Sequence, residues 1–305
     1  MNTTYLLRCV SLIVVLAVSS LISQGAAPTA KGGPTRPVAP SPRDAGPPIQ
    51  PSKVLTLFFC FVLSSFYTWL VDLHYRYPYR VFTIVKEKDG SSVLRISGQH
   101  FGGLVTRHRY TNYRFTAEFR WGTETWGARK KTARDSGILL HCQGEDGNSR
   151  ITFNAPWPRS VEYQVIEGGT GDMLMVGGYE RGTPPRRTGP EIQVAVTPGS
   201  KVWNPNGVLQ TFSSQERNVR LDWYGRDPNW KNEIDFRGAK DLEKPNGEWN
   251  TIEFISDGDH LIYYVNGIKV NEGFACSYRE GQILIQSEGA EVFYRNIKLH
   301  PLPPK

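Results

Sequence analysis

The sequence predicts an all-β fold, a jelly-roll sandwich of two antiparallel sheets. From Val93 onward, runs that alternate apolar and polar residues are separated by turns rich in Gly, Asn, Asp or Pro, which is typical of strands with one buried face. No stretch shows a sustained apolar period of about 3.6 residues with capping residues at its ends, so we expect few and short helices. These observations favour a sandwich over a helical or mixed fold.

The expected strands follow this alternation, and turn residues separate them. The strongest hairpin signal is Asn266-Gly267, because a two-residue type I′ turn requires a positive φ at both positions. Between Gly168 and Glu216 the chain is rich in Gly, Pro and Arg, and apart from one strand we expect long loops there that wall a cleft. The expected strands cover residues 113–121, 137–142, 161–166, 192–196, 219–223, 249–256, 260–265, 268–271, 282–286 and 291–299.

The first 53 residues are expected to lie outside the folded domain. Arg8 precedes an apolar run at residues 10–22, small residues follow up to Ala27, and this layout is typical of a secretory signal peptide. An uncleaved membrane anchor is disfavoured because the run is short for a bilayer span. Residues 28–53 are rich in Pro, Gly and Ala and predict an extended linker. We therefore expect removal of residues 1–27, export to the periplasm or the extracellular space, and one domain at residues 54–305.

Residues 54–71 allow two interpretations. The stretch is about as apolar as a marginal transmembrane helix, but it contains Thr56, Ser64 and Ser65 and has no basic flank beyond Lys53. If the end of this stretch belongs to a strand of the domain, the remaining apolar residues are too few to span a bilayer. We favour a first strand of the domain over membrane contact.

Composition, charge and cysteines exclude several functional classes. The 305 residues are 39% hydrophobic, which is enough for the core of one sandwich. The formal net charge is +7, but Lys and Arg are scattered and no nucleic-acid-binding motif is present, so we expect a solvated basic surface and no nucleic-acid partner. Cys9, Cys60, Cys142 and Cys276 have no metal-like spacing, and a disulfide between the last two is left open.

The candidate site lies on two neighbouring strands, at residues 135–142 and 157–172. On the second of them Glu162 and Gln164 share one face, and the residues between and beside them on the other face are apolar. A carboxylate and an amide side by side are costly to bury without partners. Their face is therefore expected to line a cleft.

Three ordered motifs carry a resemblance to a known family. They are Ser136-Gly137-Ile138, the strand Glu162-x-Gln164-x-x-Glu167, and the segment from Gln286-Ser287-Glu288-Gly289-Ala290-Glu291 to Arg295-Asn296-Ile297. Together they resemble the 3-keto-disaccharide hydrolase domain family over residues 66–302. The resemblance implies a concanavalin A-like jelly roll and an enzyme that cleaves glycosides oxidised at C3.

Such a reaction requires an acid and a base close to the sugar. A ketone at C3 acidifies the C2 hydrogen, so one base starts the elimination and one acid protonates the departing oxygen. We expect Glu162 to be acid or base, with His141 or Glu167 as its catalytic partner. The alternative for Glu162 is a structural ion pair with Arg159 or Arg134.

Further polar and aromatic residues near these strands are candidates for substrate binding. They are Gln164, Arg134, Asp135, Trp157, Asp172 and Glu288. Of these, Gln164 is expected to orient the sugar and Arg134 to stabilise the developing enolate. No residue spacing demands a metal or another cofactor, and a divalent cation is left open.

The expected partner is an oxidised di- or oligosaccharide. The alternative function is a non-catalytic, lectin-like carbohydrate-binding module, because the same architecture hosts both functions.

Overall fold

The computed structural model describes residues 46–58, 63–76 and 81–304. The predicted signal peptide and most of the predicted linker lie outside these residues, so export stays a prediction. Near the end of the linker, Ile49 lies beside Tyr110, and its backbone N–H donates to the Arg109 carbonyl at 2.8 Å. This end of the linker is therefore held against the domain. Among the described residues, no helix has both the length and the apolar character needed to cross a membrane.

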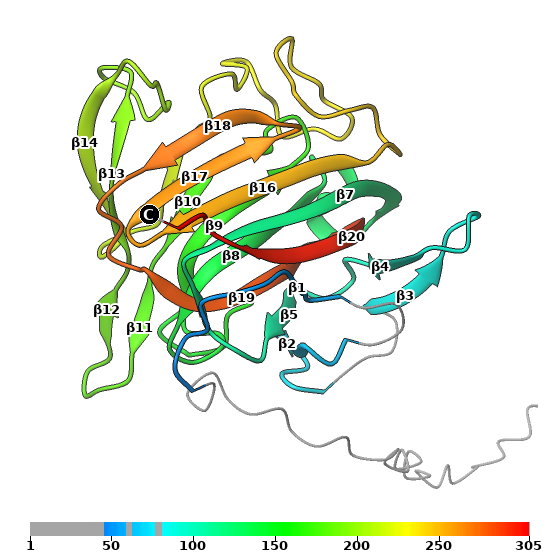
Figure 1. Cartoon of the computed structure of the whole chain (residues 1–305), viewed down its shortest axis with the longest axis horizontal. Coiled ribbons are helices and arrows are strands. Elements are labelled where there is room, and N and C mark those ends of the chain that lie inside the picture. The colour runs from blue at the N-terminus through cyan, green and yellow to red at the C-terminus, as the bar shows by residue number, and fades with distance from the viewer. Residues whose placement is uncertain (1–45, 59–62, 77–80, 305) are drawn as a thin grey trace, which may run out of the picture. The chain divides into compact units, whose positions relative to one another are not determined.

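Two antiparallel sheets form the domain, which confirms the predicted all-β, concanavalin A-like jelly-roll sandwich (Figure 1). One strand of the first sheet, β1 (Leu55–Thr56), lies outside the main strand order and pairs with β20 (Ala290–Pro301) of the same sheet. In spatial order the first sheet consists of β18 (Ile268–Gly273), β17 (His260–Val265), β16 (Asn250–Asp257), β7 (Tyr113–Thr125), β20, β4 (Ser92–Ile96) and β3 (Phe82–Lys86).

The second sheet carries the strands of the predicted site. One strand of this sheet, β6 (Tyr110–Thr111), lies outside the main strand order and pairs with β19 (Glu280–Ser287) of the same sheet. In spatial order the second sheet consists of β15 (Val219–Leu221), β10 (Met173–Val176), β9 (Arg159–Ile166), β8 (Asp135–Gln143), β19, β5 (Gly102–Thr106) and β2 (Phe66–Leu70).

Three smaller elements complete the described part of the chain. Two are hairpins, formed by β11 (Gly178–Glu180) with β12 (Arg186–Thr188) and by β13 (Glu191–Val196) with β14 (Val208–Ser213). The third is a short 3-10 helix, η2 (Gly127–Lys131), which follows β7. This helix brings basic residues to the edge of the second sheet, where they matter for the site.

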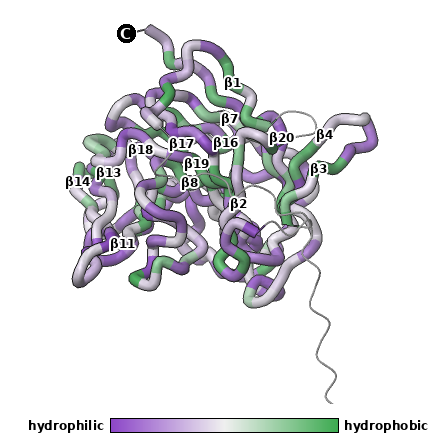
Figure 2. The backbone as a smooth tube through the Cα atoms, turned by 90° about the horizontal axis from the view of Figure 1, so that it is seen from below, coloured by the Kyte–Doolittle hydropathy of each residue, from purple (hydrophilic) through white to green (hydrophobic). Residues whose placement is uncertain are grey.

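The core lies between the two sheets because each strand turns its apolar side chains to one side. On β16, Ile252 and Phe254 are buried, whereas the intervening residues are more exposed. On β9, Val161 and Tyr163 face them, and the Tyr163 ring lies 6.3 Å from the Phe254 ring. Figure 2 shows the resulting pattern, with apolar segments along the strands and hydrophilic segments in many of the outlying loops.

Each of the predicted strands is present, with ends shifted by a few residues. Asn266 and Gly267 have φ values of 48° and 81°, which confirms the predicted turn. The expectation of long loops between Gly168 and Glu216 is wrong. The segment contains β10 to β14, because its short apolar runs continue the second sheet or pair with one another.

Residues 54–71 contribute strands β1 and β2 to the two sheets, and Leu57, Phe66 and Leu70 belong to the core. Residues 59–62, including Cys60, lie outside the described residues. Cys142 and Cys276 are both free and buried, so the disulfide that the sequence left open is not formed.

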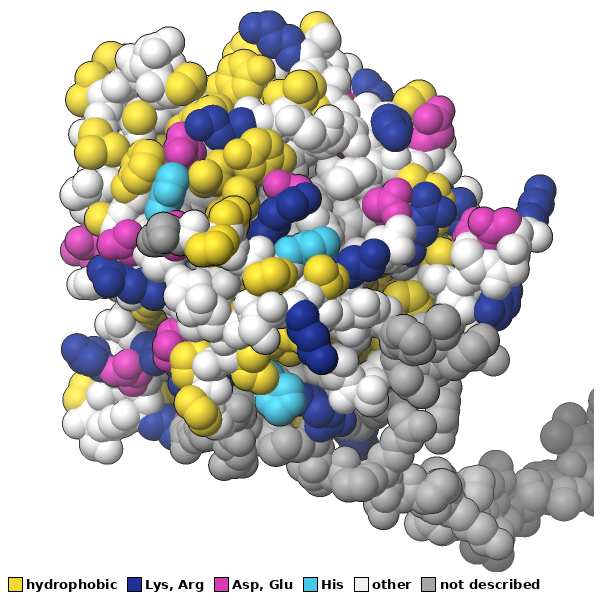
Figure 3. Space-filling model, viewed as in Figure 1, with side chains coloured by type: hydrophobic (Ala, Val, Ile, Leu, Met, Phe, Trp, Pro, Cys, Tyr) yellow, Lys and Arg dark blue, Asp and Glu magenta, His cyan; other side chains and the backbone are white. Residues whose placement is uncertain are grey.

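Charged side chains of both signs are interspersed on the face shown in Figure 3, which has no continuous basic patch. Many cations are paired with carboxylates. Arg120 lies 2.9 Å from Glu87, and Arg295 lies 3.0 Å from Glu118.

Candidate active site

The second sheet turns one face to the core and the other face away from the first sheet. On β8, Ile138 and Leu140 belong to the core, whereas Leu139 belongs to a separate apolar cluster. Leu139 lies opposite Glu162 in the antiparallel register, and residues paired in this way share a face. Glu162 therefore projects from the face turned away from the first sheet, which we call the outer face.

Glycine at position 137 makes room for the Glu162 side chain. Gly137 pairs with Gln164 on β9, and the pairing of Ile285 with Ile138 places Gln286 on its other side. A Cβ atom at Gly137 would overlap with side-chain oxygens of Glu162 and Gln286. The buried Oε1 atom of Gln286 has no hydrogen-bond donor among the described residues. The Gln286 side chain also forms a hydrogen bond with Glu162, so it helps to hold that carboxyl group in place.

Three carboxyl groups gather where β8, β9 and β19 meet. Asp135 begins β8, Glu162 lies on β9, and Glu288 follows β19. Arg129, on η2, bridges two of them, because its Nη2 atom lies 3.0 Å from Glu288 Oε1 and also contacts Asp135 Oδ2. Gln164 donates a hydrogen bond from Nε2 to Asp135 Oδ1. The predicted residues Asp135, Glu162, Gln164 and Glu288 are therefore brought together.

The environment of these carboxyl groups favours their protonated forms. Burial raises the pKa of Glu162 to about 8, the negative charge of Glu288 adds to the rise, and Arg220 opposes it. Burial also raises the pKa values of Asp135 and Glu288, and the positive charge of Arg129 opposes both shifts. At neutral pH Glu162 is mostly protonated, so it is able to donate a proton.

A buried aspartate anchors an arginine on the same face. Arg220 on β15 pairs with Leu174, and Leu174 pairs with Glu162, so all three share the outer face. Asp172 is fully buried and accepts hydrogen bonds from Arg220 Nε at 2.8 Å and from the Trp223 backbone N–H at 2.8 Å. It also pairs with a second guanidinium group, that of Arg226. Asp172 thus has no free oxygen for a sugar, and its effect on the site is to hold Arg220 in place.

Aromatic residues cover the neighbouring part of the outer face. Trp157 packs against the apolar cluster that contains Leu139 and Trp69. The Trp157 ring stacks on Phe101, with centroids 6.4 Å apart and planes at 20°. A Cβ atom at Gly289 would touch Phe101 and Arg129, so this pair borders the carboxyl groups. Both rings are half-buried and present apolar surface on which a sugar can stack.

Glu167 and Arg134 pair with each other and are not brought to Glu162. Glu167 is fully buried, and its Oε1 atom lies 2.7 Å from Arg134 Nη1. It accepts further hydrogen bonds from the backbone N–H groups of Arg134 and Asp235 and from Asn246 Nδ2. A carboxylate with this many donors is a structural group. The expected roles of Glu167 as catalytic partner and of Arg134 as enolate donor are therefore withdrawn.

His141 lies in the core and not on the outer face. Its Nε2 atom is 2.9 Å from Ser256 Oγ, and its Nδ1 atom is 2.6 Å from the Tyr278 carbonyl. The register between β8 and β9 shifts after Leu140, and His141 has a φ of 55°, so a bulge turns its side chain to the opposite face. Burial lowers the pKa of His141 to about 4. His141 is a structural residue, and its expected catalytic role is withdrawn.

The alternative of a structural ion pair for Glu162 is not observed. Arg134 is used by Glu167, and Arg159 pairs with Glu180 at 2.8 Å.

Sequence reasoning missed Arg129, Arg220 and Gln286 as site residues. Gln286 was detectable, because it precedes Glu288 by two residues in the same motif at residues 286–291. Arg220 and Arg129 gave no such signal, because β15 has only three residues and η2 lies in a basic segment without periodicity. Among the described residues, no three His, Cys, Asp or Glu side chains are placed to hold a metal ion. We therefore assign no metal ligand, and a cation requirement stays open to test.

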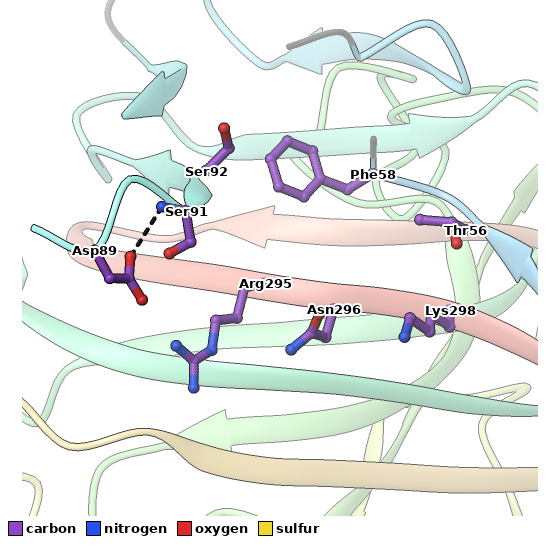
Figure 4. Close-up of a pocket in the computed structure, with 8 residues that line it drawn as sticks. All are labelled: Thr56, Phe58, Asp89, Ser91, Ser92, Arg295, Asn296 and Lys298. Atoms are coloured by element: carbon purple, nitrogen blue, oxygen red, sulfur yellow. Dashed lines mark hydrogen bonds between the residues drawn. The ribbon is translucent and has the colours of Figure 1, made fainter. Parts of the chain in front are cut away.

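A hollow of about 300 Å³ lies on the first sheet and is separate from these residues. Figure 4 shows its lining, in which Arg295, Asn296 and Lys298 come from β20 and Asp89 accepts a hydrogen bond from the Ser91 backbone. Arg295 and Asn296 both donate to Glu118. Because Glu118 holds both of these donors, we assign no catalytic role to the hollow.

Comparison with known proteins supports one family. The family model for the 3-keto-alpha-glucoside-1,2-lyase-like domain matches residues 68–300. A solved structure of a proposed glycosyl hydrolase from Parabacteroides distasonis ATCC 8503 is 15% identical and has a TM-score of 0.44, with 82% of this chain and 94% of that chain covered. A Bacillus licheniformis β-glucanase is 10% identical, with a TM-score of 0.35 and coverages of 72% and 82%. These two values are too low to bear on function. A search of curated proteins finds no match.

Proposed function

Because the chain belongs to the 3-keto-alpha-glucoside-1,2-lyase-like domain family, we propose that it cleaves glycosides oxidised at C3, with Glu162 as the proton donor. The observation that carries this proposal is the position of Glu162, a buried carboxyl group with a pKa raised to about 8, next to Asp135 and Glu288 on the outer face. A neutral carboxylic acid beside ionisable partners supplies both an acid and a base within one site.

The proposed reaction is an elimination followed by hydration. A base removes the C2 hydrogen as a proton, the bond between C1 and the glycosidic oxygen breaks, and the acid gives its proton to the departing oxygen. The product is an unsaturated ketone. Addition of water across its double bond gives net hydrolysis and returns a proton to C2.

We assign the acid to Glu162 and the base to Glu288, because the charge and the hydrogen bond of Arg129 stabilise the ionised form of Glu288 against the effect of burial. Glu162 is mostly protonated at neutral pH because of burial. Glu288 is the more accessible of the other two carboxyl groups, with 16% of its side chain exposed against 6% for Asp135. Asp135 is also held by both Arg129 and Gln164, so its oxygens are less available to a proton from the sugar.

The remaining residues of the site bind and orient the sugar. Arg220, with a third of its side chain exposed, is the cation placed to stabilise negative charge on the C3 oxygen, a role that the sequence had given to Arg134. Gln286 hydrogen-bonds to Glu162 and orients this carboxyl group toward the sugar. The rings of Trp157 and Phe101 provide a stacking surface.

The test is turnover of matched substrates by the purified chain. We would incubate 3-keto-cellobiose and its unoxidised parent, with and without a divalent cation, and measure released sugar. Wild-type protein should release sugar from the keto substrate alone, and Glu162→Gln should lose most of this activity. Glu118→Gln, on the other sheet, is the matched control and should retain it.

Two outcomes would change the assignment. Release that appears only with added cation would make a metal part of the site. Binding of both sugars without release from either would favour the non-catalytic, lectin-like carbohydrate-binding function.

Export is a separate proposal that rests on the sequence of residues 1–27. Determination of the N-terminal residue of the protein purified from its native cells tests it. A mature chain that begins after Ala27 supports export, and a chain that retains the first residues contradicts cleavage.

A further inference from the structure

A cavity of about 460 Å³ lies where β8 ends and β9 and β19 begin. Its charged lining residues are Arg109, Arg159, Arg279, Glu180 and Glu280. The volume is within the range of pockets that hold small organic ligands. The cavity is not used by the proposed reaction.

The cavity is separate from the outer face. Arg159 lies two residues from Val161, which is in the core, so it projects from the side of β9 opposite to Glu162. The hairpin β11–β12 contributes Glu180 to the lining, and the segment that precedes β19 contributes Tyr278. None of the residues that line the cavity belongs to the carboxyl cluster.

Each arginine of the cavity is held by one carboxylate. Arg109 lies 2.5 Å from Glu280, and Arg159 lies 2.8 Å from Glu180. The third, Arg279, lies 3.1 Å from Asp259. A guanidinium group has five N–H donors, so one such contact leaves most of them for water or a ligand.

The Nε–H group of Arg159 is buried and has no hydrogen-bond partner in the described part of the chain. Because this group has no exposed surface, a ligand in the cavity would contact the Nη groups of Arg159 instead. The Tyr278 side chain is half-buried at the same cavity and adds an aromatic ring beside these polar groups.

The lining offers both donors and acceptors, and this mixture indicates the kind of ligand. Three guanidinium groups and two carboxylates line the cavity, so a phosphate or sulfate would meet Glu180 and Glu280 as like charges. A hydroxyl group avoids this conflict, because it donates to a carboxylate and accepts from a guanidinium group. Several adjacent hydroxyl groups beside an aromatic ring are the features of a sugar.

We propose that this cavity is a second carbohydrate site, which binds a neutral saccharide unit without cleaving it. The inference goes beyond the proposed function and does not depend on it. Its effect would be to hold a second part of an oligosaccharide, or a neighbouring glycan, on the same chain.

The test is binding of cellobiose to the full chain, measured by calorimetry. Cellobiose lacks the C3 ketone, so the proposed reaction does not consume it during the measurement, and Glu162→Gln serves as the background. We expect Arg109→Ala to weaken one class of cellobiose site by about tenfold or more, because a hydrogen bond to a charged group contributes roughly 1.5–3 kcal/mol. Arg279→Ala is the second variant. The Arg279 side chain is 62% exposed, so its removal should leave the fold intact and allow the binding measurement even if Arg109→Ala does not fold.

Inorganic phosphate and glucuronate are the competing probes. The proposal is supported if both substitutions weaken cellobiose binding. The same two substitutions, made without Glu162→Gln, should leave the release of sugar from the keto substrate unchanged. Three results overturn it: no cellobiose binding, cellobiose binding that neither substitution changes, or binding at these arginines of phosphate or glucuronate alone. Because the readout is binding, a failure of the proposed enzymatic function leaves this test intact.

Discussion

Replacement of Glu162 by glutamine should change how the stability of the protein depends on pH. The raised pKa of Glu162 means that the folded chain binds a proton more tightly at this position than the unfolded chain does. The wild-type chain therefore loses stability from this group as the pH rises from about 4.5, where the unfolded glutamate ionises, to about 8, where the folded one does. Glutamine cannot ionise, so the variant should lack this loss.

The size of the effect follows from the two pKa values. An unperturbed glutamate has a pKa of 4.5, and Glu162 has a pKa of about 8. One pKa unit corresponds to about 1.4 kcal/mol, so ionisation of Glu162 costs on the order of 5 kcal/mol more in the folded chain than in the unfolded chain. The free energy of unfolding of the variant, minus that of the wild type, should rise by up to this amount between pH 4.5 and pH 8 and then level off.

Urea unfolding at a series of pH values, followed by tryptophan fluorescence, measures this difference. Other carboxyl groups with raised pKa values, such as Asp146 and Glu243, titrate in both proteins and largely cancel. Glu118→Gln is the matched control. Hydrogen bonds from Arg295 and Asn296 lower the pKa of Glu118 although burial acts in the other direction, so this substitution should show no such rise.

A difference that stays flat between pH 5 and pH 9 would refute the reasoning. It would mean that Glu162 is ionised at neutral pH, and a carboxylate cannot donate the proton that the departing oxygen needs.

Two further substitutions test the assignment of the other residues. Gly137→Ala should reduce kcat/KM for the keto substrate by roughly 100-fold, because the added methyl group displaces Glu162 from its position. The urea midpoint should change little. Normal turnover by this variant would show that the space beside Gly137 is not needed. Glu167→Gln should destabilise the fold by about 3 kcal/mol, because it removes the fully buried counter-ion of Arg134 and leaves only the exposed Asp235 to pair with it. The turnover of folded molecules should stay near that of the wild type, and loss of turnover at full stability would return Glu167 to the catalytic residues.

The strands could be predicted from the sequence because their signal is local. Alternation along residues 161–166 already shows that Glu162 and Gln164 share a face. Asn266-Gly267 predicts a turn because the turn requires a positive φ at both positions, and these two residues adopt it readily. Which residues cover that face is a different question, because it depends on pairing between distant strands.

Two errors show where the local signal ends. Strict alternation from Gly137 and Leu139 places His141 on the outer face, but the bulge after Leu140 adds one residue and turns the side chain into the core. Sequence spacing likewise gave no sign that Arg134 and Glu167 pair with each other. That contact depends on the path of the chain after β9, which also brings Asp235 and Asn246 to the same carboxylate.

The fate of the C2 hydrogen tests the central claim most directly. We would prepare 3-keto-cellobiose with deuterium at C2 of the oxidised ring, incubate it with the purified chain, and analyse the released sugar by mass spectrometry. The account predicts that sugar is released and that the oxidised product has lost its deuterium to water. It also predicts that Glu162→Gln, which keeps the base, still exchanges C2 but releases little sugar. Release of a product that retains its deuterium, or no release by the wild-type chain, would contradict elimination by an acid and a base on the outer face.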